Sequence, residues 1–158
     1  MPPPTRVSQR EYQALAELRY VIRKFQAFSA EAARSFDIEP QQHQLLLAIK
    51  GLPRQQRPTI GTVAERLQLQ HHSTVELVKR SVARGLLVRF EGETDHREVL
   101  LGITPLGERL LAKLSLAHKK ELRSAAPVLV DALAEIVGTS KRRSMRAPVS
   151  SVAARSIQ

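Results

Sequence analysis

A run of hydrogen-bonding side chains stands at the start of one short amphipathic segment. These residues carry amide, imidazole, hydroxyl and carboxylate groups, and they are Gln70, His71, His72, Ser73 and Glu76. Such groups recognise base edges in the major groove, where glutamine bonds twice to adenine and a carboxylate accepts from cytosine. Lys79 and Arg80 follow one turn later, where phosphate contact is the natural role of a cation. The spacing predicts a helix that reads DNA, and the competing interpretation is a solvated helix face.

A second set of charged residues falls in two predicted loops. Arg97 is expected to enter an adjacent minor groove, which attracts guanidinium groups where it is narrow. Asp95 would hold Arg97 through a charge-assisted bond, with His96 between them at the tip. For Asp95, a surface ion pair of little energetic value is the alternative. Arg54 and Arg57 could contact flanking phosphates, or they could serve the solubility of their loop alone.

Hydrophobic periodicity and capping residues predict the helices that must position these groups. Apolar side chains recur at three- and four-residue steps. The expected helices cover about residues 8–35, 40–51, 60–67, 72–84 and 104–126. Ser8 with Glu11 has the form of a capping box, Pro40 suits a first helical position, and Thr59 suits an N-cap. Pro127 is expected to break or kink the last helix, so that residues 128–137 form a final short one.

The segment after the fourth predicted helix has the pattern of a β-hairpin. Residues 86–90 and 98–103 are rich in leucine and β-branched side chains, with a turn at Gly92. In the preceding helix, the residues expected to face inward are Thr74, Leu77, Val78 and Val82. Helix, turn, helix and hairpin in this order build a winged helix-turn-helix, whose second helix fits the major groove. The predicted fold class is therefore mainly α, with a small β element (α+β).

The two long terminal helices predict self-association. Their apolar faces are wider than a small wing domain between them can bury, so pairing with a second copy is expected. A two-fold dimer would also place two reading helices about one DNA turn apart. The expected organisation comprises a DNA-binding region over about 40–104, dimerisation helices over about 8–36 and 104–138, and disordered ends at 1–7 and 139–158.

The composition is that of one basic domain. The chain has 158 residues and a formal charge of +10, from 25 basic and 15 acidic residues. Five of the basic residues lie in the segment 139–158, which contains no acid. The excess is therefore partly an effect of the tail, and the net charge alone is a weak argument for a nucleic-acid partner. The tail is expected to add non-specific, salt-sensitive attraction to DNA.

Several classes of site and protein are disfavoured by what the sequence lacks. Without cysteine there can be no disulfide, thiolate metal site or thiol redox sensor. His71 and His72 are adjacent on a helix and point about 100° apart, so they are poorly placed to chelate one ion. No glycine-rich phosphate loop or catalytic constellation is present, which predicts a protein that is not an enzyme and needs no metal or cofactor. No apolar run approaches membrane-spanning length, so we expect a cytoplasmic protein, associated with the nucleoid when DNA-bound.

Five short motifs together resemble the multiple antibiotic resistance regulator (MarR) family of winged-helix transcription factors. They are Pro40-Gln-Gln-His-Gln-Leu45, Val63-Ala-Glu-Arg-Leu67, His71-His-Ser-Thr-Val75 with Gly85-Leu86, Asp95-His-Arg97 and Ile103-Thr-Pro-Leu-Gly107. The resemblance covers about residues 12–137. It implies a homodimer on a pseudo-palindromic operator in double-stranded DNA, usually as a repressor that a small organic ligand releases. It also implies a ligand crevice, whose candidate residues are Tyr20, Arg23, Lys24, Phe28 and His43. The competing interpretation is that most of these five are ordinary core or surface residues.

The sequence departs from the family pattern at a few positions. Ser81 stands where the recognition helix normally packs a leucine, and Arg89 is followed by Phe90 instead of a further arginine. Glu91 and Glu93 add negative charge beside the expected phosphate surface. Together with Glu76, these acids favour an alternative function, a winged-helix protein-interaction module without specific DNA binding. Arg97 and the basic excess favour DNA.

Overall fold

The computed structural model describes residues 6–92 and 98–138. In chain order the elements are α1 (Gln9–Ser35), α2 (Pro40–Lys50), α3 (Ile60–Leu67), α4 (His71–Ala83), β1 (Leu87–Glu91), β2 (Val99–Ile103) and α5 (Pro105–Ile136). The prediction of a mainly helical winged helix-turn-helix with one small antiparallel sheet is confirmed. The predictions made for Asp95, His96, Arg97, Glu93, most of the N-terminal segment and the basic tail fall outside the described residues.

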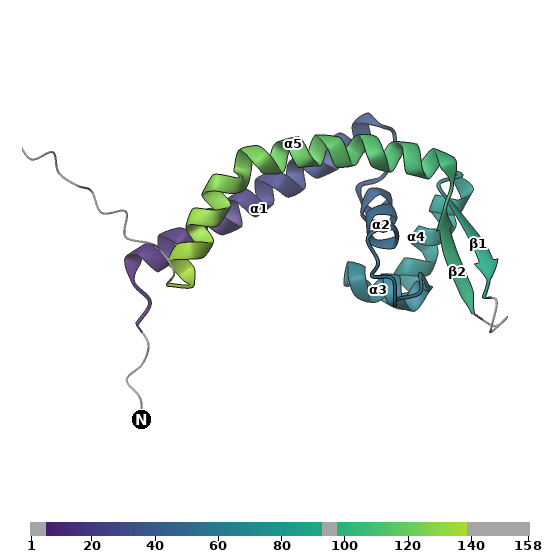
Figure 1. Cartoon of the computed structure of the whole chain (residues 1–158), viewed down its shortest axis with the longest axis horizontal. Helices are drawn as coiled ribbons and strands as arrows, with labels where there is room; N and C mark the ends of the chain where they lie inside the picture. The colour runs from purple at the N-terminus through teal and green to yellow at the C-terminus, as the bar shows by residue number, and fades with distance from the viewer. Residues whose placement is uncertain (1–5, 93–97, 139–158) are drawn as a thin grey trace, which may run out of the picture.

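Two parts make up the molecule. Helices α1 and α5 lie side by side and form a long curved arm, while α2, α3, α4, β1 and β2 form a winged-helix module beneath one end of the arm (Figure 1). The start of α1 and the end of α5 lie together at the far end of the arm. The module therefore sits at one end of the arm, and the other end extends away from it.

Helix ends follow from local side-chain chemistry. The Ser8 hydroxyl accepts from the Glu11 N–H, and the Glu11 carboxylate accepts from the Ser8 N–H, which confirms the predicted capping box. Thr59 and Thr104 each accept an N–H from the first turn of α3 and α5. Gly85 follows α4 with a φ of 68°, which glycine adopts without strain. The Ser8, Thr59 and Thr104 caps satisfy N–H groups that a helix leaves without intrahelical partners.

Helix α5 corrects one prediction. Pro127 lies inside a continuous helix, so the predicted break and the separate short helix over 128–137 are wrong. Proline removes one backbone hydrogen bond, but the turns on both sides of it are held by packing of α5 along α1, where Ala132 is buried. Figure 1 shows α5 curving without interruption.

The hydrophobic core lies in the module and under the first half of α5. Its fully or nearly fully buried members include Leu45, Leu46, Val63, Leu77, Val78, Leu86, Leu87, Leu101, Leu111 and Leu114. Gly107 lets α5 approach Leu86, the residue before β1, closely, because an added Cβ would collide with the Leu86 carbonyl oxygen. Core packing thus joins the wing to the start of the arm.

The inward face of α4 differs from the prediction at one position. Thr74, Leu77 and Val78 are buried as expected, whereas Val82 is 36% exposed. The buried position belongs to Ser81, whose hydroxyl donates to the Leu77 carbonyl at 2.8 Å. A small side chain there lets α4 pack closely while the backbone satisfies its hydroxyl.

Candidate nucleic-acid interface and crevice

The face of α4 opposite the core is fully open. The seven DNA-contact candidates of α4 and its N-cap are all exposed, and they are Gln70, His71, His72, Ser73, Glu76, Lys79 and Arg80. Gln70 is the N-cap, but its side chain makes no capping hydrogen bond. The first-turn N–H groups of α4 lack a side-chain acceptor from the cap and, with the helix dipole, favour an anion. One exposed face therefore combines base-reading groups with a site suited to phosphate.

Acidic partners hold the two cations of this face. The Lys79 ammonium lies 2.6 Å from a Glu76 oxygen, and Arg80 donates to the Glu39 carboxylate at 3.1 Å. The hydrogen bond from Lys79 lowers the pKa of Glu76, and the positive charges of Lys79, Arg80 and Arg89 lower it further. Glu76 is thus a carboxylate at neutral pH, a group that accepts hydrogen bonds from cytosine.

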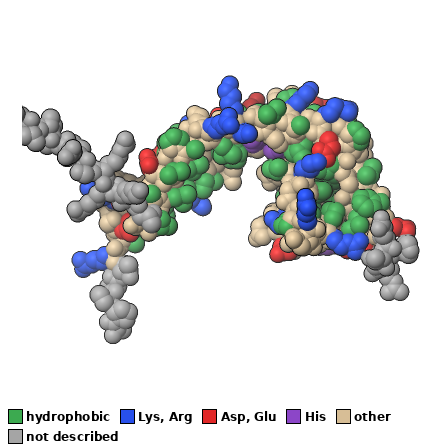
Figure 2. All heavy atoms as spheres, in the orientation of Figure 1, with side chains coloured by type: hydrophobic (Ala, Val, Ile, Leu, Met, Phe, Trp, Pro, Cys, Tyr) green, Lys and Arg blue, Asp and Glu red, His purple; other side chains and the backbone are tan. Residues whose placement is uncertain are grey.

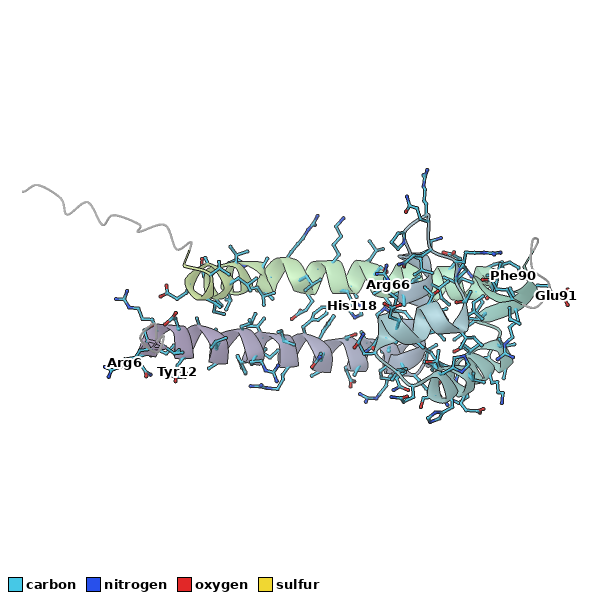
Figure 3. The ribbon with its side chains drawn as sticks, turned by 90° about the horizontal axis from the view of Figure 1, so that it is seen from below. Arg6, Tyr12, Arg66, Phe90, Glu91 and His118 are labelled. Atoms are coloured by element: carbon cyan, nitrogen blue, oxygen red, sulfur yellow. The ribbon has the colours of Figure 1, made fainter. Side chains whose placement is uncertain are left out.

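Arg89 of β1 is a contact candidate that sequence reasoning did not select. It is exposed, and its charge acts on Glu76 of α4, so the wing and α4 share one electrostatic surface. The two-residue alternation of β1 separates Arg89 from Val88 and Phe90, and that signal could have identified it. Phe90 and Glu91 mark the wing at the end of the molecule opposite Tyr12 (Figure 3).

The two predicted loop arginines have different surroundings. Arg57 forms an ion pair with Glu98, next to the start of β2, and thereby ties the loop before α3 to the wing. Arg54 is exposed in the same loop. Arg66, which sequence reasoning passed over, donates to Gln56 at 2.7 Å and steadies the loop from α3.

A crevice of about 1050 Å³ lies where α1, α2 and α5 meet. Most of its walls are apolar, and they include Val21, Ile22, Phe25, Leu47, Leu122 and Leu129. Lys119 and Arg123 of α5 also line it. An apolar crevice with a few polar groups is the usual form of a small-molecule site.

His43 is the buried polar group of this crevice. It is 2% exposed, and neither ring nitrogen has a hydrogen-bond partner among the described residues. Its ring centroid lies 4.6 Å from that of His118. Burial lowers the pKa of His43 to about 4, and the nearby His118 contributes. The ring is therefore neutral at pH 7, with one nitrogen able to donate and the other able to accept.

His118 links the two helices of the arm. Its Nδ1 lies 2.6 Å from the Leu114 carbonyl oxygen and its Nε2 lies 2.8 Å from the Ser29 hydroxyl. A carbonyl only accepts, so Nδ1 carries a proton, and in the neutral ring Nε2 accepts from Ser29. Figure 3 shows His118 between α5 and α1.

Residues 36–98, which run from the end of α1 to the wing, match the model described as the MarR family. Over these residues the chain is similar to the MarR family. No curated protein matches the chain.

Several solved structures share the fold of this chain. A MarR family protein from Bacillus stearothermophilus is 21% identical, with a TM-score of 0.64 and coverage of 76% of this chain and 82% of that one. AbsC, a MarR family transcriptional regulator from Streptomyces coelicolor, is 14% identical, with a TM-score of 0.64 and coverage of 85% and 95%. MepR of S. aureus in a DNA complex is 19% identical, with a TM-score of 0.57 and coverage of 77% and 90%.

The five ligand candidates inferred from the MarR resemblance do not share one place. His43 lines the crevice, and the other four do not. Lys24 lies over the exposed ring of Tyr20, 5.6 Å from its centroid, and Arg23 is exposed. Phe28 meets the His118 ring edge-on at 5.5 Å. Phe25 and His118 line the crevice instead. Their spacing in the sequence is the same as that of ordinary core residues, so it gave no signal for a ligand site.

Two kinds of feature are absent from the described part of the chain. Residues 6–92 and 98–138 contain no group of three or more histidine, aspartate or glutamate side chains that could hold a metal ion. Within the same ranges, each helix is too short or too polar to cross a membrane.

Proposed function

We propose that the protein is a homodimeric transcriptional regulator that binds double-stranded DNA with α4 in the major groove. The observation that carries the proposal is the exposure of every base-reading candidate on α4, while Thr74, Leu77 and Val78 anchor the opposite face in the core. A protein of the same fold, MepR, has been solved in complex with DNA, which supports the proposal. We assign base reading to Gln70, His71, His72, Ser73 and Glu76 and phosphate contact to Lys79.

The wing and its neighbouring loop supply the flanking contacts. We assign minor-groove contact to Arg97, and Asp95 and His96 remain DNA-contact candidates on their sequence positions alone. Arg54, Arg57 and Arg89 face flanking phosphates. These contacts position the protein on the duplex, and the readers on α4 carry sequence preference.

Exposed apolar side chains on the arm support self-association. Figure 2 shows hydrophobic side chains gathered along the arm. The most exposed of the arm's large apolar side chains are Tyr12, Tyr20, Leu116, Val130 and Val137. A second copy would cover much of this surface and present two α4 helices to a pseudo-palindromic operator.

The crevice supports response to a small organic effector. His43 lines its wall where α2 of the module meets the arm, and its ring nitrogens have no hydrogen-bond partner among the described residues. An effector there releases DNA only if it binds more tightly to a dimer whose α4 spacing no longer fits the half-sites. Repression in the cytoplasm, with nucleoid association while DNA-bound, completes the proposal.

Selection of bound duplexes from a random pool, using the full chain, tests this function. We expect a two-fold symmetric consensus, with affinity that falls by orders of magnitude between about 50 and 200 mM salt if six or more phosphates are contacted. Lys79→Ala should weaken binding to all sequences, whereas His72→Ala should change the selected bases. No salt-dependent binding to any duplex would favour the protein-interaction module instead.

A further inference from the structure

The joint between α1 and α2 connects the arm to the module. Asp37 closes α1 with a φ of 56°, and the Ile38 N–H donates to the Ala33 carbonyl at 3.2 Å. Ile38 is buried in the core, and Glu39 is the N-cap of α2. The joint (residues 37–39) is therefore a defined turn with both carboxylates at the surface.

The end of α4 is fastened to this joint through two arginines. Arg84 donates through Nη2 to the Asp37 carbonyl oxygen and to the Asp37 carboxylate at 2.9 Å. Arg80, one turn earlier, donates to the Glu39 carboxylate at 3.1 Å. Both contacts bridge more than forty residues of sequence, so the fold alone brings these groups together.

These contacts are better suited to orientation than to stability. All four side chains are between 42% and 95% exposed, and exposed ion pairs add little to the free energy of folding. Their geometry nevertheless ties the C-terminal end of the reading helix to the connection between module and arm. A small rotation at that end would displace His71 and His72, about 15 to 20 Å away along the helix.

We propose that Arg80 and Arg84 are positioning residues, which hold α4 at the angle that DNA requires through their contacts with Glu39 and Asp37. The inference rests on the proposed DNA binding and revises the predicted phosphate role of Arg80. Because neither guanidinium contacts DNA, removal of its partner loosens α4 and weakens binding without changing the number of phosphates engaged.

The test is a salt titration of the selected operator with the full chain carrying Asp37→Asn. Asparagine tolerates the left-handed backbone, so the turn is kept while the charge is lost. We expect affinity to fall by about 5-fold to 10-fold, with an unchanged salt slope and a Tm within about 2 °C. Glu39→Gln should act in the same direction. Tighter binding by either variant would overturn the proposal, because it would mean that the acids hold the arginines back from phosphate.

Two comparisons separate orientation from general charge. Glu31→Gln removes an acid from another exposed ion pair, with Arg34 in α1, and should leave affinity unchanged. Arg84→Gln combined with Asp37→Asn should bind no more weakly than Arg84→Gln alone, whereas additive losses or a slope lowered by about one in Arg84→Gln would contradict the inference. If the unmodified protein bound no duplex, the proposed function would fail as well. If the unmodified protein bound normally and Asp37→Asn had the same affinity, this inference alone would be wrong.

Discussion

The module buries many of its large apolar side chains, whereas the arm leaves several of its own exposed. In the module, Leu45, Leu46 and Val63 are fully buried within one chain. On the arm, Leu116 and Val130 remain 70% and 62% exposed, although α1 and α5 run along each other. A core that closes within one chain can fold alone, whereas an open apolar face is stabilised by a partner surface. We therefore expect the module to determine monomer stability and, in the proposed dimer, the arm to form the assembly surface.

The largest effect should come from the module core. Leu46→Ala creates a cavity at a fully buried position and should lower the free energy of unfolding by about 2–5 kcal/mol. Urea denaturation followed by circular dichroism measures the loss. A change below about 1 kcal/mol would mean that the module core is not the main source of stability.

The next effect concerns the contact between the module and the arm. Gly107→Ala forces a Cβ against the Leu86 carbonyl and should cost about 1–3 kcal/mol of unfolding free energy. Gly61→Ala is the matched control, since its Cβ meets only the Thr59 hydroxyl at 3.8 Å within a helix. Thermal unfolding should show a lower Tm for the first variant and an equal or higher Tm for the second. Equal losses in both would show that α5 does not approach Leu86 this closely.

A smaller effect should appear on acidification. Burial lowers the pKa of His43 from 6.5 to about 4, so between these values the unfolded state binds the additional proton. Stability is retained above pH 6.5 and falls as the pH is lowered toward 4. We expect His43 to account for about 1–2 kcal/mol of this fall, less than the full shift allows, because the crevice is accessible to water.

His43→Leu should remove that part of the pH dependence, whereas His71→Asn on the exposed face of α4 should leave it intact. Urea midpoints at pH 4.5 and 7 measure the difference. An unchanged pH dependence in His43→Leu would show that His43 is not buried in the neutral form.

The smallest expected effect tests the arm. Leu133→Ala truncates an exposed apolar side chain of α5 and should weaken self-association about tenfold, with little change in monomer stability. Val82→Ala, at an exposed apolar position of the module, should leave assembly unchanged. Sedimentation velocity across a concentration series distinguishes the two. Equal association in both variants would mean that the arm is not the assembly surface.

Most helix starts in this protein were predictable, because the signals are local. Ser8, Thr59 and Pro40 act on backbone groups within one turn, so sequence spacing alone identifies them. Pro127 was misjudged because its local tendency to end a helix is opposed by packing against α1, which sequence spacing does not show. Val82 was predicted to face inward but is exposed, whereas Ser81 is buried. The reason is similar, since both positions border the same apolar stripe of α4.

The same distinction between local and long-range contacts applies to the candidate sites. The predicted base-reading residues of α4 share one helix, so their common exposed face followed from the helical period. The crevice joins residues of α1, α2 and α5, and four of its five predicted ligand residues lie elsewhere. The contacts of Arg80 with Glu39 and of Arg84 with Asp37 cross even longer separations. No spacing rule connects such residues before the chain folds.

By itself, the order of amino acids determined the helices, the hairpin and the polar face of α4, because these depend on neighbours a few residues away. Only the tertiary structure decided that α5 passes through Pro127, that His43 meets His118, and that α4 is fastened to the joint between α1 and α2. Those outcomes depend on which surfaces come into contact, and contact energies over long separations are set by the whole packed chain.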